Sequence, residues 1–347
     1  MSLPAYVYDL SALRDHVSAI RDAMEGVELY YAAKANPDPE LLRVLSPLVD
    51  GFEVASAGEL AHVRAAVPGR PLALGGPGKT DEELRSEVAR IHVESPGELR
   101  RLLAMGRPAG ILLRANLDLP VEGASLAMGG GATPFGMDPG SIEECLTLLK
   151  GQEAVTVHGL HAHLASGLDA PQMLTLAEGV LDYARSLGLT EINLGGGMAV
   201  SYAHPDARFD WVTYGRGLRA LRRPGETLRV EPGRSISVYC GRYVTRVIDV
   251  KRVHGELFAV VAGGTHHLRT PATKGHSQPL VIERPGEPIT IVGQLCTPKD
   301  VLAAHVPVRL EPGDVVEFLM AGAYAWNISH HDFLMHPHPA FRYTLSR

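Results

Sequence analysis

The chain has 347 residues, of which 45% are hydrophobic and 21% are charged, and its formal net charge at pH 7 is −6. This is the composition of an ordinary globular protein that can form one large domain and a smaller one. A net negative charge argues against nucleic acid and anionic membrane surfaces as partners, because both bind basic surfaces. No apolar run approaches the roughly 20 residues of a membrane-spanning helix, and no secretory pattern opens the chain, so we expect a cytoplasmic protein.

The three cysteines, Cys145, Cys240 and Cys296, are odd in number and far apart. That spacing fits neither a disulfide framework nor a zinc-ligand motif, so we expect reduced thiols and predict no metal site from them. Cys145 lies in a helical pattern and Cys240 in an apolar strand, where small buried thiols are common. Cys296 lies in polar, turn-rich surroundings, where a thiol can take part in chemistry.

The first predicted element is a helix, because Leu13, Val17, Ile20 and Met24 follow helical spacing and Ser11 can cap its start. Short apolar strands then alternate with helical stretches. The strands are expected near residues 27–34, 50–55, 71–75, 90–93, 110–116, 155–162, 190–195 and 227–231. Such alternation requires a parallel sheet, and eight repeats in roughly 220 residues favour a closed (β/α)8 barrel of the TIM type over an open sheet.

Beyond Arg234 helical periodicity disappears, and β-branched runs are broken by Gly and Pro. These runs lie at 243–250, 257–262, 288–292 and 315–319. We therefore predict an α/β fold with a barrel domain over residues 10–235. A mainly antiparallel β domain is expected over residues 236–347, joined by residues 1–9.

Lys34 is the most informative single residue. It follows the apolar strand from Val27 to Ala33, and Asn36-Pro37 ends that strand. Desolvation at a strand end lowers the pKa of an ammonium group, so the neutral amine that attacks an aldehyde becomes available near neutral pH. An isolated lysine after a strand is usually a surface lysine, and Lys34 gains its meaning from the other motifs.

Polar or glycine residues also end other predicted strands, namely Glu53, His163, Gly195 to Gly197 and Glu231. They share the C-terminal face, where barrels of this kind carry their active sites. The glycines let backbone amides approach an anion such as a phosphate, although a flexible turn is the simpler interpretation. A buried Glu231 needs a cationic partner, and Arg234 is one candidate within the sequence.

His161 and His163 lie two residues apart on one predicted strand and therefore share a face, which raises the question of a metal site. The surrounding sequence offers no third ligand. We therefore predict no metal, and we interpret His161 as a packed neighbour of His163.

Several motifs occur in order along almost the whole chain, at residues 30–36, 51–60, 161–166, 193–197, 231–234, 294–300 and 322–324. Together they resemble the pyridoxal-phosphate decarboxylases of the ornithine/diaminopimelate type. The resemblance implies pyridoxal 5'-phosphate as cofactor and Lys34 as its Schiff-base lysine, with Glu53 as the charge partner. It places His163 against the cofactor ring and Glu231 at the pyridinium nitrogen, where a carboxylate keeps the ring an electron sink.

The resemblance also implies a set of residues at the cofactor's phosphate: Ser166, Gly195, Gly196, Gly197, Arg234 and Tyr324. It further implies a homodimer with shared active sites, in which Cys296 reaches the neighbouring subunit's site and protonates Cα after carbon dioxide leaves. A thiol can do so, because its reference pKa is about 8.5. Ala165 stands where the family usually has Gly, a departure that bears on the geometry of this loop.

The substrate is indicated by departures from the family pattern. Thr297 and Gly263 stand where relatives acting on diamines or diaminopimelate usually place acidic residues, so a contact for a distal ammonium is missing. Residues 264–276 hold several basic residues and no acid, which suits an anionic substrate arm; a solvated basic loop is the alternative. The residues expected to bind that arm are Arg269, His266, His267 and Thr297.

The Cys-Thr-Pro and Gly-Gly-Thr-His-His sequences further resemble decarboxylases of carboxylate-siderophore pathways, whose substrates are amino acids acylated by citrate. We therefore predict decarboxylation of a polyanionic citryl amino acid. Three alternatives stay open: a decarboxylase of free diaminopimelate, ornithine or lysine, a pyridoxal-dependent racemase, and a non-catalytic cofactor-binding protein. Racemisation needs a second base opposite the lysine, whereas Cys296 favours decarboxylation.

Overall fold

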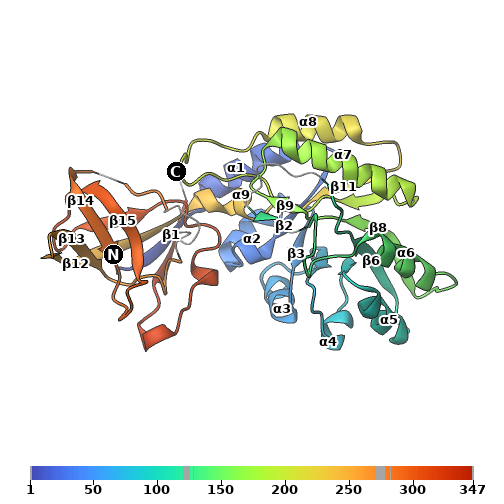
Figure 1. Ribbon diagram of the computed structural model, residues 1–347, viewed down its shortest axis with the longest axis horizontal. Coiled ribbons are helices and arrows are strands. Elements are labelled where there is room, and N and C mark those ends of the chain that lie inside the picture. Colours follow the sequence, from blue (N-terminus) through green and yellow to red (C-terminus); the bar gives the residue numbers. More distant parts are fainter. Residues whose placement is uncertain (1, 120–125, 128, 270–277, 282, 346–347) are drawn as a thin grey trace. The chain divides into compact units, whose positions relative to one another are not determined.

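The computed structural model describes residues 2–119, 126–127, 129–269, 278–281 and 283–345. The chain divides into two compact units. One, called here the barrel unit, comprises residues 14–199 and 209–235, and the other, called the β unit, comprises residues 1–13, 200–208 and 236–347 (Figure 1). Among the described residues no helix combines the length and the apolar character needed to cross a membrane.

The barrel unit contains eight parallel strands that close on themselves in the order β10-β11-β2-β3-β4-β5-β6-β8. Their bounds are β2 Glu28–Ala32, β3 Gly51–Val54, β4 Leu72–Leu74, β5 Arg90–Val93, β6 Ala109–Arg114, β8 Val155–His161, β10 Glu191–Asn193 and β11 Thr227–Val230. The predicted barrel is therefore confirmed, with each strand at its expected place. A two-stranded antiparallel sheet, β7 (Leu126–Ala127) with β9 (Ala165–Ser166), also forms.

Helices surround the strands of the barrel (Figure 1). They are α1 Leu10–Ala23, α2 Pro39–Leu45, α3 Ala57–Ala66, α4 Asp81–Leu84, α5 Pro96–Ala104, α6 Pro139–Leu148, α7 Ala170–Ser186, α8 Trp211–Leu221 and α9 Arg234–Ser237. Helices α2 to α8 each follow an Asp, Ser or Thr whose side chain accepts a backbone N–H of the first turn. The expected cap at Ser11 is wrong: α1 already begins at Leu10, and Asp9 Oδ1 accepts the Ala12 N–H at 2.9 Å.

Polar side chains fill part of the barrel interior in two layers. The lower layer is Arg90, Glu191 and Arg229, and the upper layer is His92, Asn193 and Glu231. Each residue of the upper layer follows one of the lower layer by two positions, on β5, on β10 and at the end of β11, so the two side chains point to the same side of the sheet. Arg90 Nη2 lies 2.7 Å from Glu191 Oε2 although β5 and β10 are not neighbours, so these side chains meet across the interior.

The β unit is built on a seven-stranded sheet in the order β15-β14-β13-β12-β1-β17, with β16 also paired to β12. The strands are β1 Ala5–Asp9, β12 Gly241–Val253, β13 Glu256–Val261, β14 Pro285–Val292, β15 Val301–Val308, β16 Val315–Phe318 and β17 Ala340–Thr344. Most pairs are antiparallel as predicted, whereas β1–β17 and β13–β14 run parallel.

Two strands of this sheet, β15 and β17, were not predicted. The middle of β15 is Ala303-Ala304-His305, which lacks β-branched residues, and His305 has a positive φ of 52°. β17 follows a proline-rich stretch and pairs in parallel with β1 from the other end of the chain. Local pattern therefore did not indicate β15, whereas Phe341, Tyr343 and Thr344 of β17 were a usable local signal that was missed.

Candidate active site

Lys34 lies in a short 3-10 turn, Ala33–Ala35, directly after β2. Its Nζ is 3.1 Å from Glu53 Oε1 and 2.9 Å from Glu53 Oε2, on the neighbouring strand β3. The Lys34 side chain is 47% exposed and that of Glu53 is 6% exposed. The desolvation expected for Lys34 is thus partial. Burial raises the pKa of the Glu53 carboxyl, and Lys34 opposes that rise.

Glu231 follows β11 and is buried. Its Oε1 accepts the Asn193 Nδ2 amide at 2.6 Å, and its Oε2 lies 3.1 Å from His161 Nε2. His92 Nε2 lies 3.7 Å from Glu231 Oε1, and the rings of His92 and His161 stack with centroids 4.1 Å apart. Burial holds the pKa of both histidines well below its ordinary value, so both rings are neutral.

The glycine loop after β10 has room only for glycine. Gly195 and Gly197 have φ values of +66° and +111°, and a Cβ on Gly197 would lie 2.2 Å from the Ala165 carbonyl oxygen. His163 Nδ1 accepts the Gly196 N–H at 3.1 Å. Burial, followed by the charge of Lys34, lowers the pKa of His163 to about 3, so this ring is neutral as well.

Ser166 and Arg234 lie at the same end of the barrel strands. Ser166 belongs to β9, and the residue after it is tied to the glycine loop through the Gly167 N–H to Gly197 carbonyl hydrogen bond of 2.7 Å. Arg234 is the first residue of α9 and is half-buried. The barrel unit therefore gathers all its predicted site residues at the C-terminal ends of its strands.

Arg114, the last residue of β6, was missed by sequence reasoning. It is buried, and its Nη1 lies 2.7 Å from Glu94 Oε1. Its positive charge contributes to the lowered pKa of His161 and of His163. The signal was available, because a charged residue at the end of a predicted barrel strand is the same pattern that singled out Glu53.

The sequence around His161 offers no third ligand, but in the structure possible ligand atoms from distant segments lie beside it. Ligand atoms of His92, His161 and Glu231 lie within 4.8 Å of one another. The two rings, however, stack at an interplanar angle of 19°. An ion bound to an imidazole nitrogen lies in the plane of the ring, and no ion can lie in the planes of two stacked rings. As arranged, the trio is suited to hydrogen bonding rather than to metal binding.

Comparison with known proteins shows the family to which the chain belongs. The C-terminal ends of the barrel strands, where the predicted site residues lie, are called here the barrel mouth. The family model described as "Pyridoxal-dependent decarboxylase, pyridoxal binding domain" matches residues 10–238. The chain belongs to this family. It is therefore a pyridoxal-phosphate-dependent decarboxylase, and the interpretation as a non-catalytic binding protein is set aside.

The decarboxylase is 39% identical to the 2-[(L-alanin-3-ylcarbamoyl)methyl]-2-hydroxybutanedioate decarboxylase of Staphylococcus aureus (strain NCTC 8325 / PS 47), with 97% of this chain and 93% of that protein covered. It is 31% identical to the diaminopimelate decarboxylase of Deinococcus radiodurans, covering 97% and 89% of the two chains. A crystal structure of diaminopimelate decarboxylase from Helicobacter pylori complexed with L-lysine superposes with a TM-score of 0.86 at 26% identity, covering 95% and 88%.

The residues of the barrel mouth fit the decarboxylase's cofactor. The glycine loop leaves backbone space that any Cβ would fill, as at Gly195, where it would lie 2.8 Å from the Ala162 carbonyl oxygen. A half-exposed amine, a buried carboxylate at Glu231 and a neutral His163 ring supply groups suited to an aldehyde, a pyridinium nitrogen and an aromatic face. This donor set matches pyridoxal phosphate in kind.

The remaining predicted site residues belong to the β unit of the decarboxylase. Cys296 is exposed and Thr297 follows it in a turn, while Cys145 and Cys240 are buried as expected. Tyr324 is half-buried and has a positive φ of 48°.

The predicted substrate segment packs against residues 326–338. The Arg269 N–H donates to Ser329 Oγ at 3.0 Å, and His267 Nε2 lies 2.9 Å from the Pro337 carbonyl oxygen. His266 and His267 are buried, which lowers their pKa to about 4 and about 3, so neither is the solvated basic residue of the alternative interpretation. Both are neutral at pH 7, and the cation of the described part of this segment is Arg269; residues 270–276 lie outside the described residues.

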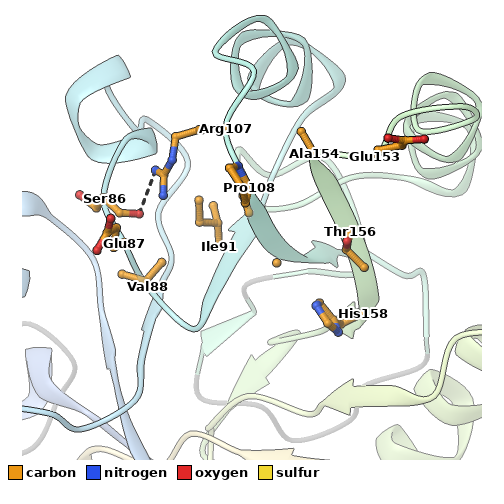
Figure 2. Close-up of a pocket in the computed structure, with 12 residues that line it drawn as sticks. Ser86, Glu87, Val88, Ile91, Arg107, Pro108, Glu153, Ala154, Thr156 and His158 are labelled. Atoms are coloured by element: carbon orange, nitrogen blue, oxygen red, sulfur yellow. Dashed lines mark hydrogen bonds between the residues drawn. The ribbon is translucent and has the colours of Figure 1, made fainter.

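A hollow of about 800 Å³ opens at the opposite end of the barrel, where β5, β6 and β8 begin (Figure 2). Thr156 and His158 of β8 border it, and Arg107 donates to the Ser86 carbonyl oxygen at 3.1 Å on its other side. It lies away from the C-terminal strand ends and contains none of the predicted site residues.

Proposed function

We propose that this decarboxylase removes carbon dioxide from a citryl-conjugated amino acid, in the cytoplasm and in a carboxylate-siderophore or related pathway. The observation that carries the proposal is its 39% identity, over 97% of the chain, to the S. aureus enzyme. The name of that enzyme's substrate describes a hydroxybutanedioate joined through a carbamoyl group to C3 of alanine, which is a citrate amide of 2,3-diaminopropionate.

Pyridoxal phosphate, when bound, supplies an aldehyde and a ring that accepts the electron pair released when the Cα–carboxylate bond breaks. In our proposal the Lys34 amine would hold the cofactor covalently, and Glu53 would compensate positive charge at that nitrogen. Glu231 would keep a proton at the pyridine nitrogen, and the neutral His163 ring would supply an aromatic contact to the cofactor.

The other residues bind the ends of the cofactor and return the proton. The amides of Gly195 to Gly197, together with Ser166, Arg234 and Tyr324, bind the phosphate. Carbon dioxide leaves Cα, and one proton, from the thiol of Cys296, takes its place.

The distal end of the substrate carries carboxylates in this proposal, and Arg269 binds them. Support comes from its exposed side chain on a backbone held by Ser329, and from Thr297 and Gly263, which offer no carboxylate to an ammonium. His266 and His267 are assigned a neutral supporting role. The second candidate, decarboxylation of a free amino acid, is supported by the diaminopimelate decarboxylases at 29–31% identity.

The test is to incubate the purified enzyme with the citrate amide of diaminopropionate, and separately with free diaminopimelate, ornithine and lysine, while measuring carbon dioxide release and product mass. We expect release from the citryl substrate first. Faster release from a free amino acid would support the second candidate, and racemisation without carbon dioxide release would support a racemase.

Arg269→Ala should raise the KM for the citryl substrate roughly 10- to 150-fold, the loss of a guanidinium–carboxylate contact of about 1.5–3 kcal/mol. Arg252→Ala is the matched control, because Arg252 is also an exposed arginine of the β unit and pairs with Glu287 at 2.7 Å. An equal KM for the two variants would remove Arg269 from the substrate site.

We further propose a homodimer in which Cys296 of one chain serves the site that contains Lys34 of its partner. Mixing Lys34→Ala chains with Cys296→Ala chains should then restore activity, because one of the two sites in a mixed dimer carries neither substitution. Mixed dimers that stay inactive would place both residues in the site of the same chain.

A further inference from the structure

Glu231 is surrounded by neutral donors. Asn193 is an amide, and His92 and His161 are imidazoles whose pKa values are lowered by burial first and then by neighbouring charges. The charges of Lys79 and Arg114 lower the pKa of both rings and that of Lys34 lowers the pKa of His161, whereas Glu231 raises the pKa of His92. Burial and these positive charges outweigh the effect of Glu231, so the pKa of both rings lies well below its ordinary value. Among the residues that the structure describes, the ion-pair contacts of Glu231 are therefore to these two neutral imidazoles and not to a lysine or arginine.

The hydrogen-bond pattern selects one tautomer of His161. Its Nε2 is 3.1 Å from Glu231 Oε2, whereas its Nδ1 is buried without a hydrogen-bond partner among the described residues. A proton on Nδ1 would be a buried N–H without an acceptor, which costs more than leaving a lone pair unused. His161 therefore donates its Nε2–H to Glu231.

His92 acts on the same carboxylate indirectly. Its Nε2 is 3.7 Å from Glu231 Oε1, beyond hydrogen-bond range, and the described part of the chain offers it no other hydrogen-bond partner. Its ring stacks on that of His161 with centroids 4.1 Å apart. The stack fixes the plane of the His161 ring and hence the direction of the N–H that meets Glu231.

A carboxylate accepts about four hydrogen bonds, and Asn193 and His161 occupy two of these positions, one on each oxygen. Such donors fix the orientation of the group without neutralising it. A protonated histidine in the same place would form an ion pair with Glu231 and compete with any other cation for it.

We infer that His161, held in plane by His92, is a positioning residue that keeps Glu231 oriented and negatively charged for the pyridine nitrogen of the cofactor. The inference rests on the role proposed for Glu231. It adds that the donor must be neutral and must reach Oε2. A side chain that fills the volume of His161 without donating a hydrogen bond should then not keep Glu231 oriented, whereas a neutral amide of similar length should.

The test uses the complete protein loaded with pyridoxal phosphate labelled with 15N in the ring. The 15N chemical shift, followed against pH, reports the proton on that nitrogen, and kcat and KM are measured on the same samples. The variants are His161→Leu, His161→Gln and, as control, His158→Leu. His158 lies on the same strand but borders the hollow at the other end of the barrel (Figure 2).

In His161→Leu the ring nitrogen should lose its proton at a pH about one unit or more below that of the wild type, and kcat should fall roughly 10- to 100-fold with KM changed less than about twofold. His161→Gln should recover most of both properties, because its amide still donates. His158→Leu should match the wild type. Thermal unfolding of each cofactor-free variant checks that it is folded.

A wild-type 15N titration in folded His161→Leu would overturn the inference, and so would His161→Gln behaving like His161→Leu. Should His161→Leu fail to fold, His161→Asn carries the same expectation, since its shorter amide cannot reach Glu231. Glu231→Gln tests the role of Glu231 separately from the role of His161. If that change leaves the ring proton unaffected, the proposed role of Glu231 falls; if it shifts the titration and His161→Leu does not, only the role of His161 falls.

Discussion

The two polar layers of the barrel interior lie two residues apart on the same strands and handle buried carboxylates in opposite ways. In the lower layer Glu191 meets two guanidinium groups, with Arg90 Nη2 at 2.7 Å and Arg229 Nη1 at 2.8 Å. In the upper layer Glu231 meets an amide and a neutral imidazole. One carboxylate pairs with cations of the chain, and for the other we propose a cation from outside it.

The difference separates stability from chemistry within one barrel. Burial raises the pKa of Glu191, but the hydrogen bonds and charges of Arg90 and Arg229 outweigh it, so the net pKa is lowered. Burial of Glu53, near the mouth, leaves its pKa raised despite Lys34. Glu53, His161 and His163, whose pKa values burial shifts away from their ordinary range, lie at the C-terminal ends of the strands, where such barrels react.

The largest expected effect is on activity in the upper layer. Glu231→Gln preserves the shape of the side chain but removes its charge and replaces one of its two acceptor oxygens by an N–H donor, so kcat should fall about 10²- to 10³-fold, as when one preorganised electrostatic contact is lost. The unfolding midpoint of the cofactor-free protein should fall by no more than a few degrees. Near-normal turnover in this variant would show that Glu231 is structural. The upper layer would then not differ from the lower layer in function.

The lower layer should respond in the opposite way. Glu191→Gln removes the carboxylate that pairs with the half-buried Arg90 and one of the two that pair with the buried Arg229, which keeps Glu28, so the free energy of unfolding at pH 7 should drop by about 2 kcal/mol. The kcat of the folded fraction should stay within about twofold of the wild type. Chemical denaturation and steady-state kinetics on the same samples check both. A large loss of kcat in folded protein would contradict the assignment of the lower layer to stability and the upper layer to catalysis.

The wild type and Glu191→Gln also test how the stability provided by Glu191 depends on pH. Because the folded-state pKa of Glu191 is lowered from its ordinary value of 4.5, its contribution to stability is present above that pH and is lost as the pH falls through the folded value. The stability difference between wild type and Glu191→Gln should therefore be full at pH 7 and should narrow below pH 4.5. A constant difference across this range would mean that ionisation of Glu191 plays no part.

The smallest expected effect comes from Arg90→Lys. Arg90 Nε and Nη2 both donate to the Glu191 carboxylate, at 3.0 and 2.7 Å, and lysine cannot reproduce that fork. We expect a loss of about 1 kcal/mol in the free energy of unfolding and unchanged kcat. A loss as large as that of Glu191→Gln would indicate that the geometry of the pair matters more than its charge.

Much of this arrangement could be predicted from the sequence. Apolar runs of strand length separated by helical periods indicated all eight barrel strands, and strand ends indicated Lys34, Glu53, His163 and Glu231. These signals are local, because a strand's length, its burial and the residue that follows it all lie within one short segment.

The rest depends on contacts across the barrel. His92, Asn193 and His161 meet at Glu231 from different strands, and no local pattern states that register. The burial that neutralises His266 and His267 also comes from a segment about 60 residues away. Arg114 differs, since its position at the end of a predicted strand was a usable signal.

The most direct test of the account is to find where the cofactor is bound. The purified enzyme, loaded with pyridoxal phosphate and reduced with borohydride, is digested, and the peptides are weighed and sequenced by mass spectrometry. The account predicts that the mass of the reduced cofactor is attached to Lys34 and that Lys34→Ala carries none at any other lysine. Attachment to a different lysine, such as the buried Lys79, would contradict it.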